Sequence, residues 1–210
     1  MKKVIRLGPG DKVHMTARFN EILDTRPDLL EDVQGGFIDY VAELTNLPSM
    51  GAAWKQVADF IEGASKRLWA ESEVKPVCKK GCSMCCYQSV GVSDYEAEKL
   101  IPYVTPDKIE HLQKQFHKKR ENWGYAPENR CIFLQDDGAC GVYENRPLVC
   151  RITFGTEPEK CSTSSPQKLP TSIGSEIAVS AFWTIDGKVD SMPRKLLKFL
   201  DPGVRLGGLK

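Results

Sequence analysis

The chain contains no run of apolar residues that approaches the roughly 18 needed for a membrane-spanning helix. Its basic N-terminal start is not followed by an apolar segment of signal-peptide length. Neither sign of charge is in excess, because 29 lysines and arginines face 28 aspartates and glutamates. These absences argue against a membrane protein and against a global electrostatic attraction to nucleic acid, and they predict a cytoplasmic location.

Cysteine is absent from the first 77 residues, and eight cysteines follow. Four of them lie between Cys78 and Cys86, and four are spread from Cys131 to Cys161. Such clustering has three candidate causes, which are disulfides, redox exchange and metal ligation. Because a reducing cytoplasm disfavours stable disulfides, we expect metal binding or redox chemistry. The eight candidate metal ligands are Cys78, Cys82, Cys85, Cys86, Cys131, Cys140, Cys150 and Cys161.

Hydrophobic spacing predicts a mainly α fold. Apolar residues recur every three to four positions from Leu30 to Leu44 and again from about Gly51 to Glu71, which predicts two helices that form an antiparallel pair. We expect this pair to pack on a small irregular α+β cysteine-cluster domain with a short β-hairpin. The expected segments are a helical extension at 1–72, a cysteine-cluster metal-binding domain at 73–165, and a C-terminal loop with a candidate strand and a short helix at 166–210.

Local signals place the elements of the cysteine region. Ser93 and Glu96 have the spacing of a capping box and predict a helix from Asp94 to Ile101. Thr105 and Pro106 predict the start of another helix. Further signals predict a strand or extended loop at 87–92, a hairpin around Asp137-Gly138, a helical turn after Pro147, a strand at 178–185 and a helix at 196–200.

The spacing of the first four cysteines limits which of them can share a metal. Cys82 and Cys85 can converge in a tight turn, which Gly81 would enter with a positive φ. Cys85 and Cys86 are adjacent, so their side chains diverge in any regular backbone. We therefore expect three of these thiols at one centre and one elsewhere.

The downstream hairpin limits the other cysteines in the same way. In a regular ladder, a two-residue loop leaves Cys131 and Cys140 far apart on one face, and a three-residue loop puts them on opposite faces. Neither register brings both thiols to one metal. If the hairpin is regular, the eight thiols therefore serve at least two separate roles.

Basic residues accompany the thiols and would offset the negative charge of thiolates or lower a cysteine pKa. They are Lys79, Lys80, Arg130, Arg146 and Arg151. His14, His111 and His117 lie far from the cysteines in sequence and are expected to be solvated or core histidines.

The pair Cys82 and Cys85 also has thioredoxin-type spacing, and the addition of Cys78 gives that of radical S-adenosylmethionine enzymes.

The order of the motifs resembles a known family. Cys78-x3-Cys82-x2-Cys85-Cys86, the segment Cys131-Ile132-Phe133-Leu134, and the segment from Asp137 to Arg151 with Tyr143-Glu144-Asn145-Arg146-Pro147 follow one another. This arrangement is similar to the bacterial zinc- or iron-chelating domains called CxxCxxCC or YkgJ-like. The first gap holds three residues here, where the family name has two.

The resemblance implies a protein that holds zinc or an iron–sulfur cluster through its cysteines. We predict Cys82, Cys85 or Cys86, and Cys150 as direct ligands, with Cys78 as a further ligand. Arg146 and Arg151 are expected to donate hydrogen bonds around the cofactor and to offset its charge. We favour iron–sulfur because eight thiols exceed the need of one zinc ion. A protein partner on the N-terminal helices is also predicted. The family is similar to flagellin lysine N-methylases, so a methylase-like enzyme is one alternative, and a thiol redox protein is another.

Overall fold

A computed structural model of the chain describes residues 30–71, 73, 76–78, 81–116, 127–154, 173–187 and 189–200. The fold is mainly α with one short antiparallel strand pair, which confirms the predicted fold class. Among the helices in these ranges, none combines the length and the apolar character required to traverse a lipid bilayer.

The chain divides into two compact units. Residues 1–75 and 170–189 form the first, called the helical unit below, and residues 76–169 and 190–210 form the second, called the cysteine unit. The C-terminal part of the sequence is thus shared between the two units. The three segments predicted from the sequence stay a prediction.

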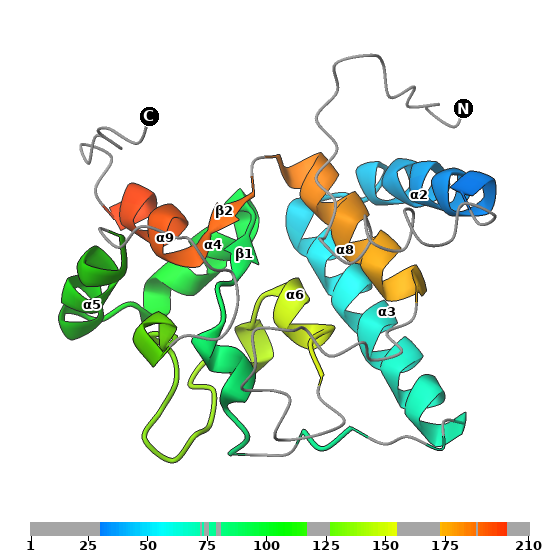
Figure 1. The fold of residues 1–210 in the computed structure, drawn as a ribbon. Helices are drawn as coiled ribbons and strands as arrows, with labels where there is room; N and C mark the ends of the chain where they lie inside the picture. Colours follow the sequence, from blue (N-terminus) through cyan, green and yellow to red (C-terminus); the bar gives the residue numbers. More distant parts are fainter. Residues whose placement is uncertain are drawn as a thin grey trace. The chain divides into compact units, whose positions relative to one another are not determined.

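The helical unit contains α2 (Leu30–Thr45), α3 (Met50–Glu71) and α8 (Ile173–Asp186), drawn in blue, cyan and orange in Figure 1. The two helices predicted in the N-terminal third are confirmed. Residues that form the apolar stripes, such as Val41 on α2 and Ile61 on α3, are buried. The spacing of three to four residues therefore identified both core-facing surfaces correctly.

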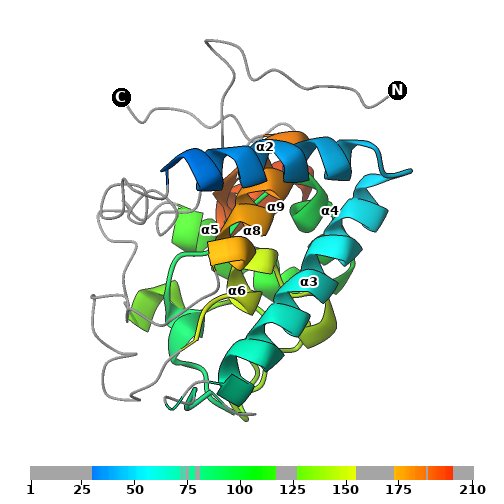
Figure 2. The same cartoon turned by 90° about the vertical axis from the view of Figure 1, so that its right-hand side faces the viewer.

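The expected pairing of α2 with α3 is only part of the packing. The rings of Tyr40 and Phe60 lie 6.0 Å apart, and Gln56 Nε2 donates to Glu43 Oε1 at 2.7 Å, so the two helices touch. However, α8 packs against both of them, and Figure 2 shows it beside α2 and α3. Among the described residues of this unit, three helices therefore pack together, and the third of them comes from far along the chain.

The predicted strand at 178–185 is wrong, because these residues lie within α8. Ala178, Val179, Phe182 and Trp183 are all buried, and so is Ser180 between them. A helix that is buried on several sides has a nearly continuous apolar sequence, which periodicity cannot distinguish from a buried strand.

The cysteine unit has its core between helices α4 (Asp94–Leu100), α5 (Pro106–Phe116) and α9 (Met192–Leu200). The predicted starts of α4 and α5 are confirmed. The terminal helix begins earlier than predicted, at Met192. The buried core consists of Val92, Ala97, Leu100, Leu112, Ile132, Phe133, Val142, Met192, Leu196 and Leu197.

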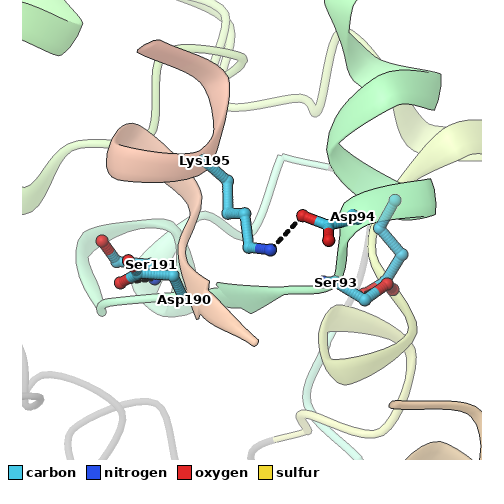
Figure 3. Close-up of polar contacts among 6 residues, drawn as sticks. Ser93, Asp94, Asp190, Ser191 and Lys195 are labelled. Atoms are coloured by element: carbon cyan, nitrogen blue, oxygen red, sulfur yellow. Dashed lines mark hydrogen bonds and ion pairs between the residues drawn. The ribbon is translucent and has the colours of Figure 1, made fainter. Parts of the chain in front are cut away.

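The C-terminal segment closes this core through a two-stranded antiparallel sheet. Strand β1 (Gly91–Val92) pairs with β2 (Asp190–Ser191), and the Met192 N–H donates to the Val90 carbonyl at 2.8 Å. Lys195 on α9 is buried and forms an ion pair with Asp94 at the start of α4, as Figure 3 shows. Strand β2 was not predicted, because two residues provide no periodicity.

Glu96 joins the start of α4 to a short helix that carries one of the cysteines. Its Oε2 accepts the Ser93 N–H at 3.0 Å and the Ser93 hydroxyl at 3.1 Å, as the capping box predicts. Its Oε1 accepts the N–H of Leu148 at 2.7 Å, the first residue of α6 (Leu148–Arg151). The carboxylate is 2% exposed, so a single buried group fixes α6 against α4.

Replacement of Glu96 by Gln should lower the free energy of unfolding by about 2–3 kcal/mol, because hydrogen bonds to charged groups contribute about 1.5–3 kcal/mol and the amide nitrogen cannot accept one. Urea denaturation followed by circular dichroism measures the change. The exposed Glu98 on the same helix provides the control, and Glu98→Gln should alter stability by less than about 0.5 kcal/mol. Equal losses in both variants would contradict the role given to Glu96.

Candidate metal centre

The first cysteine segment is a tight turn. Gly81 has a φ of +86°, which confirms the predicted left-handed entry. A 3-10 turn, Met84–Tyr87, follows, and the Cys86 N–H donates to the Ser83 carbonyl at 2.8 Å. Cys78 is exposed, whereas Cys82, Cys85 and Cys86 are half-buried. Of the predicted site residues and neighbouring charges, Cys161, Lys79, Lys80, His14 and His117 lie outside the described residues.

The predicted hairpin around Asp137-Gly138 is present as a single antiparallel bridge between Leu134 and Cys140. The Gln135 N–H donates to the Ala139 carbonyl at 2.9 Å, so the loop holds three residues. The ladder stops on both sides of this bridge. The Leu134 N–H bonds back to the Cys131 carbonyl at 3.1 Å, and a 3-10 turn, Tyr143–Asn145, begins soon after Cys140.

The prediction that the eight thiols serve at least two separate roles assumed a regular hairpin, and this hairpin is irregular. Because Cys131 lies in a turn and not in a regular strand, its direction is not set by strand alternation. The charge of Cys140 acts on Cys131 and raises its pKa, so the two thiols lie within electrostatic range of each other. The argument that they cannot serve one centre therefore no longer applies.

The two cysteine segments meet backbone to backbone. The Cys131 N–H donates to the Cys86 carbonyl at 2.7 Å. The loop between Cys131 and Cys140 also crosses the turn at Gly81: a Cβ at Gly138, where φ is +79°, would lie 2.6 Å from the Gly81 carbonyl oxygen. Only glycine allows this approach. The contact holds the first cysteine segment against the loop that precedes Cys140.

Five thiols from three parts of the chain interact in this region. Burial raises the pKa of Cys131 to about 11, and the charges of Cys140 and Cys85 contribute. Burial also raises the pKa of Cys150 well above its usual range, and the charges of Cys85, Cys131 and Cys140 add to it. A hydrogen bond to Cys86, followed by burial, raises the pKa of Cys85. Cys85, Cys131 and Cys150 therefore stay protonated near neutral pH unless a cation compensates them.

Within the ranges that the structure describes, no three Cys, His, Asp or Glu side chains are arranged to hold a metal ion. The thiols are thus neighbours within electrostatic range and not an assembled ligand set. The donor chemistry nevertheless fits a soft metal, because thiolates are the preferred ligands of zinc and of iron–sulfur clusters. Cys82, Cys85, Cys86, Cys131, Cys140 and Cys150 are free thiols, which is consistent with such a role.

The match to a family model agrees with this chemistry. Residues 77–167 match the model CxxCxxCC, which is described as "Putative zinc- or iron-chelating domain". This segment, called the chelating domain below, is less than half of the chain and is similar to that family. The family resemblance inferred from the sequence is confirmed, and the helical unit lies outside the match. We found no match to this chain among curated proteins or among solved structures.

Arg146 and Arg151, the two arginines predicted to donate hydrogen bonds around the cofactor, make different contacts in the chelating domain. Arg151 is 4% exposed, and its guanidinium donates to the carbonyls of Glu144 at 2.6 Å and Arg146 at 3.4 Å. Arg146 stacks on the Tyr143 ring with its Cζ 3.8 Å from the ring centroid. Its positive charge also acts on Cys85, where it opposes the rise in pKa. Arg151 thus holds the turn from which Arg146 extends.

Glu96 is a residue of the chelating domain whose proximity to the site was not foreseen. Its negative charge contributes to the raised pKa of Cys150. The two residues are close because the Glu96 carboxylate accepts the N–H of Leu148, the first residue of α6. The capping-box spacing identified Glu96 as a helix residue, but only the fold brings it next to a cysteine. Of the three histidines, His111 lies in the described part of the chain, and its Nε2 is 3.2 Å from the Arg130 carbonyl oxygen.

Gly138→Ala should destabilise the chelating domain by about 2–4 kcal/mol, because a left-handed φ costs an alanine about 1–2 kcal/mol and the overpacked Cβ adds to it. Gly187 is a matched control, since its φ is +99° and a Cβ there would meet no atom within 4 Å. Gly187→Ala should cost only about 1–2 kcal/mol. Urea unfolding monitored by circular dichroism compares the two, and equal costs would contradict a steric role for the Gly81–Gly138 contact.

Proposed function

We propose that the chelating domain holds one metal centre, either zinc or an iron–sulfur cluster, through Cys85, Cys131, Cys140 and Cys150. The observation that carries this proposal is the meeting of the cysteine segments, in which the Cys131 N–H donates to the Cys86 carbonyl at 2.7 Å and Gly138 lies against Gly81. The charges of Cys85, Cys131 and Cys140 also raise the pKa of Cys150, which agrees with this arrangement. Four thiolates are the usual ligand number for a structural zinc ion and for common iron–sulfur clusters. The family description supports the coarser statement that the domain chelates zinc or iron.

Cys86 takes a supporting role in this proposal. Its side chain shares a hydrogen bond with Cys85, and its carbonyl accepts the Cys131 N–H at 2.7 Å. Adjacent cysteines point in different directions, so one of the pair acts as the ligand and the other lies beside it. Cys78, Cys82 and Cys161 stay predicted ligands, and they are the candidates for completing or extending the centre.

A bound zinc ion would supply a closed structural cross-link between the three segments, and an iron–sulfur cluster would add electron transfer or sensing. We favour the cluster because the domain has more thiols than one zinc ion needs. The domain's own contribution is to bring the thiols together, to exclude water from them, and to place a positive charge beside Cys85.

Thiol redox exchange is a second candidate, because Cys85 and Cys86 are hydrogen-bonded neighbours. The raised pKa values of Cys85, Cys131 and Cys150 weigh against it, since redox-active cysteines react as thiolates. Metal binding is therefore the preferred function. The methylase-like alternative, the cytoplasmic location and a protein partner on the N-terminal helices stay predictions.

The metal is identified by purifying the protein without oxygen, recording its absorption near 400 nm, and measuring its iron, sulfide and zinc content. We expect a coloured protein with iron and sulfide, because iron–sulfur clusters absorb in this range and bind through thiolates. A colourless protein with stoichiometric zinc would overturn the preference for iron–sulfur and keep the chelating function. A protein with neither metal after reconstitution would overturn both.

The ligand set is tested by single serine substitutions at Cys85, Cys131, Cys140 and Cys150, followed by metal analysis. Each should lose most of the bound metal, because a hydroxyl is a poor ligand for a soft ion. Glu98→Gln is the control, since Glu98 is exposed and supplies no thiol, and it should retain the bound metal. Full retention of metal in Cys140→Ser would overturn the proposed set.

A further inference from the structure

Arg146 has a polar group that no contact in the described structure uses. Its Nε is buried, and no hydrogen-bond acceptor among the described residues meets it. The guanidinium is held in place by the Tyr143 ring, whose centroid lies 3.8 Å from Cζ, which is a cation–π geometry. Most buried N–H groups in native proteins have an acceptor, so an unused one calls for an explanation.

The buried Arg151, in the same unit, has hydrogen-bond acceptors for its guanidinium. Two backbone carbonyls, those of Glu144 and Arg146, accept its hydrogen bonds. Its neighbour Arg146 lies only five residues away on the same turn and lacks such acceptors at Nε. The contrast indicates that Arg146 is placed for a different acceptor, whereas Arg151 completes the backbone of the turn.

The cysteine cluster is the acceptor that the surroundings offer. The charge of Arg146 already acts on Cys85, so the two side chains are within electrostatic range. A metal-bound thiolate keeps lone pairs that accept hydrogen bonds, and a centre with several thiolates carries excess negative charge. Both properties match a half-buried arginine whose Nε–H is buried and has no acceptor among the described residues.

We propose that Arg146 donates its Nε–H to a thiolate of the metal-loaded centre, at Cys85, and that Tyr143 and Arg151 are positioning residues that aim it there. This inference rests on the proposed metal-binding function. It assigns different roles to the two arginines: Arg146 tunes the centre directly, and Arg151 acts only through the turn that carries Arg146.

The test uses cobalt(II) as the probe, loaded into the full-length protein after chelator treatment. Competition with a chelator measures the cobalt affinity, and the sulfur-to-cobalt charge-transfer band reports on the thiolates. The variants are Arg146→Gln, Arg146→Lys and Tyr143→Ala. The matched control is Arg130→Gln, which removes the same charge one residue before Cys131. The guanidinium of Arg130 already pairs with Asp136 at 3.3 Å.

Arg146→Gln should weaken cobalt binding by about 10- to 100-fold, as is typical for partners of metal ligands. It should also move the charge-transfer band to longer wavelength, because a thiolate that loses a hydrogen bond gives up an electron more easily. Arg146→Lys should recover only part of the affinity, since it restores the charge without the Nε donor. Tyr143→Ala should lie between Arg146→Gln and the wild type.

Three results would overturn the inference. The first is Arg146→Gln with wild-type affinity and an unmoved band. The second is an equal effect of Arg130→Gln, which would show that net charge alone matters. The third is a lower urea midpoint for cobalt-free Arg146→Gln with an unmoved band, which would indicate a purely structural role. If the wild type itself binds no cobalt, zinc or iron, the proposed function fails, and this inference fails with it.

Discussion

The carboxylate of Glu96 is the constraint on which the cysteine unit depends most. One buried group satisfies the N-cap of α4 and the first N–H of α6, two elements that lie far apart in sequence. Its partners are a backbone N–H, a hydroxyl and another backbone N–H, so its negative charge is compensated by hydrogen bonds. The position of Cys150 follows, because it is the third residue of the four-residue helix α6, whose first N–H is held by Glu96.

Irregular backbone builds the rest of the candidate site. A long ladder would have fixed both Cys131 and Cys140 by strand alternation, whereas here only Cys140 lies in the single bridge and Cys131 lies in a turn beside it. The close approach of Gly81 and Gly138 then holds the two cysteine segments together without side chains. Small metal-binding domains commonly gain stability from their ligands, and the loops here need such support because few of their residues lie in regular elements.

Charged side chains of opposite sign act on two of the thiols. Glu96 adds negative charge near Cys150, whereas Arg146 adds positive charge near Cys85. Burial dominates over both at Cys150 and Cys131, and it favours the neutral thiols. A bound cation would reverse that balance, because it compensates thiolate charge at short range. The same arrangement that makes the thiols poor nucleophiles therefore suits them to hold a metal.

The sequence by itself determined the features that depend on near neighbours. The stripes on α2 and α3, the capping box at Ser93 and Glu96, and the left-handed Gly81 all follow from interactions within a few residues, and each was predicted correctly. The family was also readable, because the order and spacing of the cysteines is a local pattern.

Only the tertiary structure decided which distant segments meet. The sequence did not indicate that β2 would pair with β1, that α8 would be a buried helix, or that Cys131 would lie within electrostatic range of Cys140. The physical reason is the same in each case. A two-residue strand, a uniformly buried helix and a broken hairpin carry no periodicity of their own, so packing against remote residues selects their conformation.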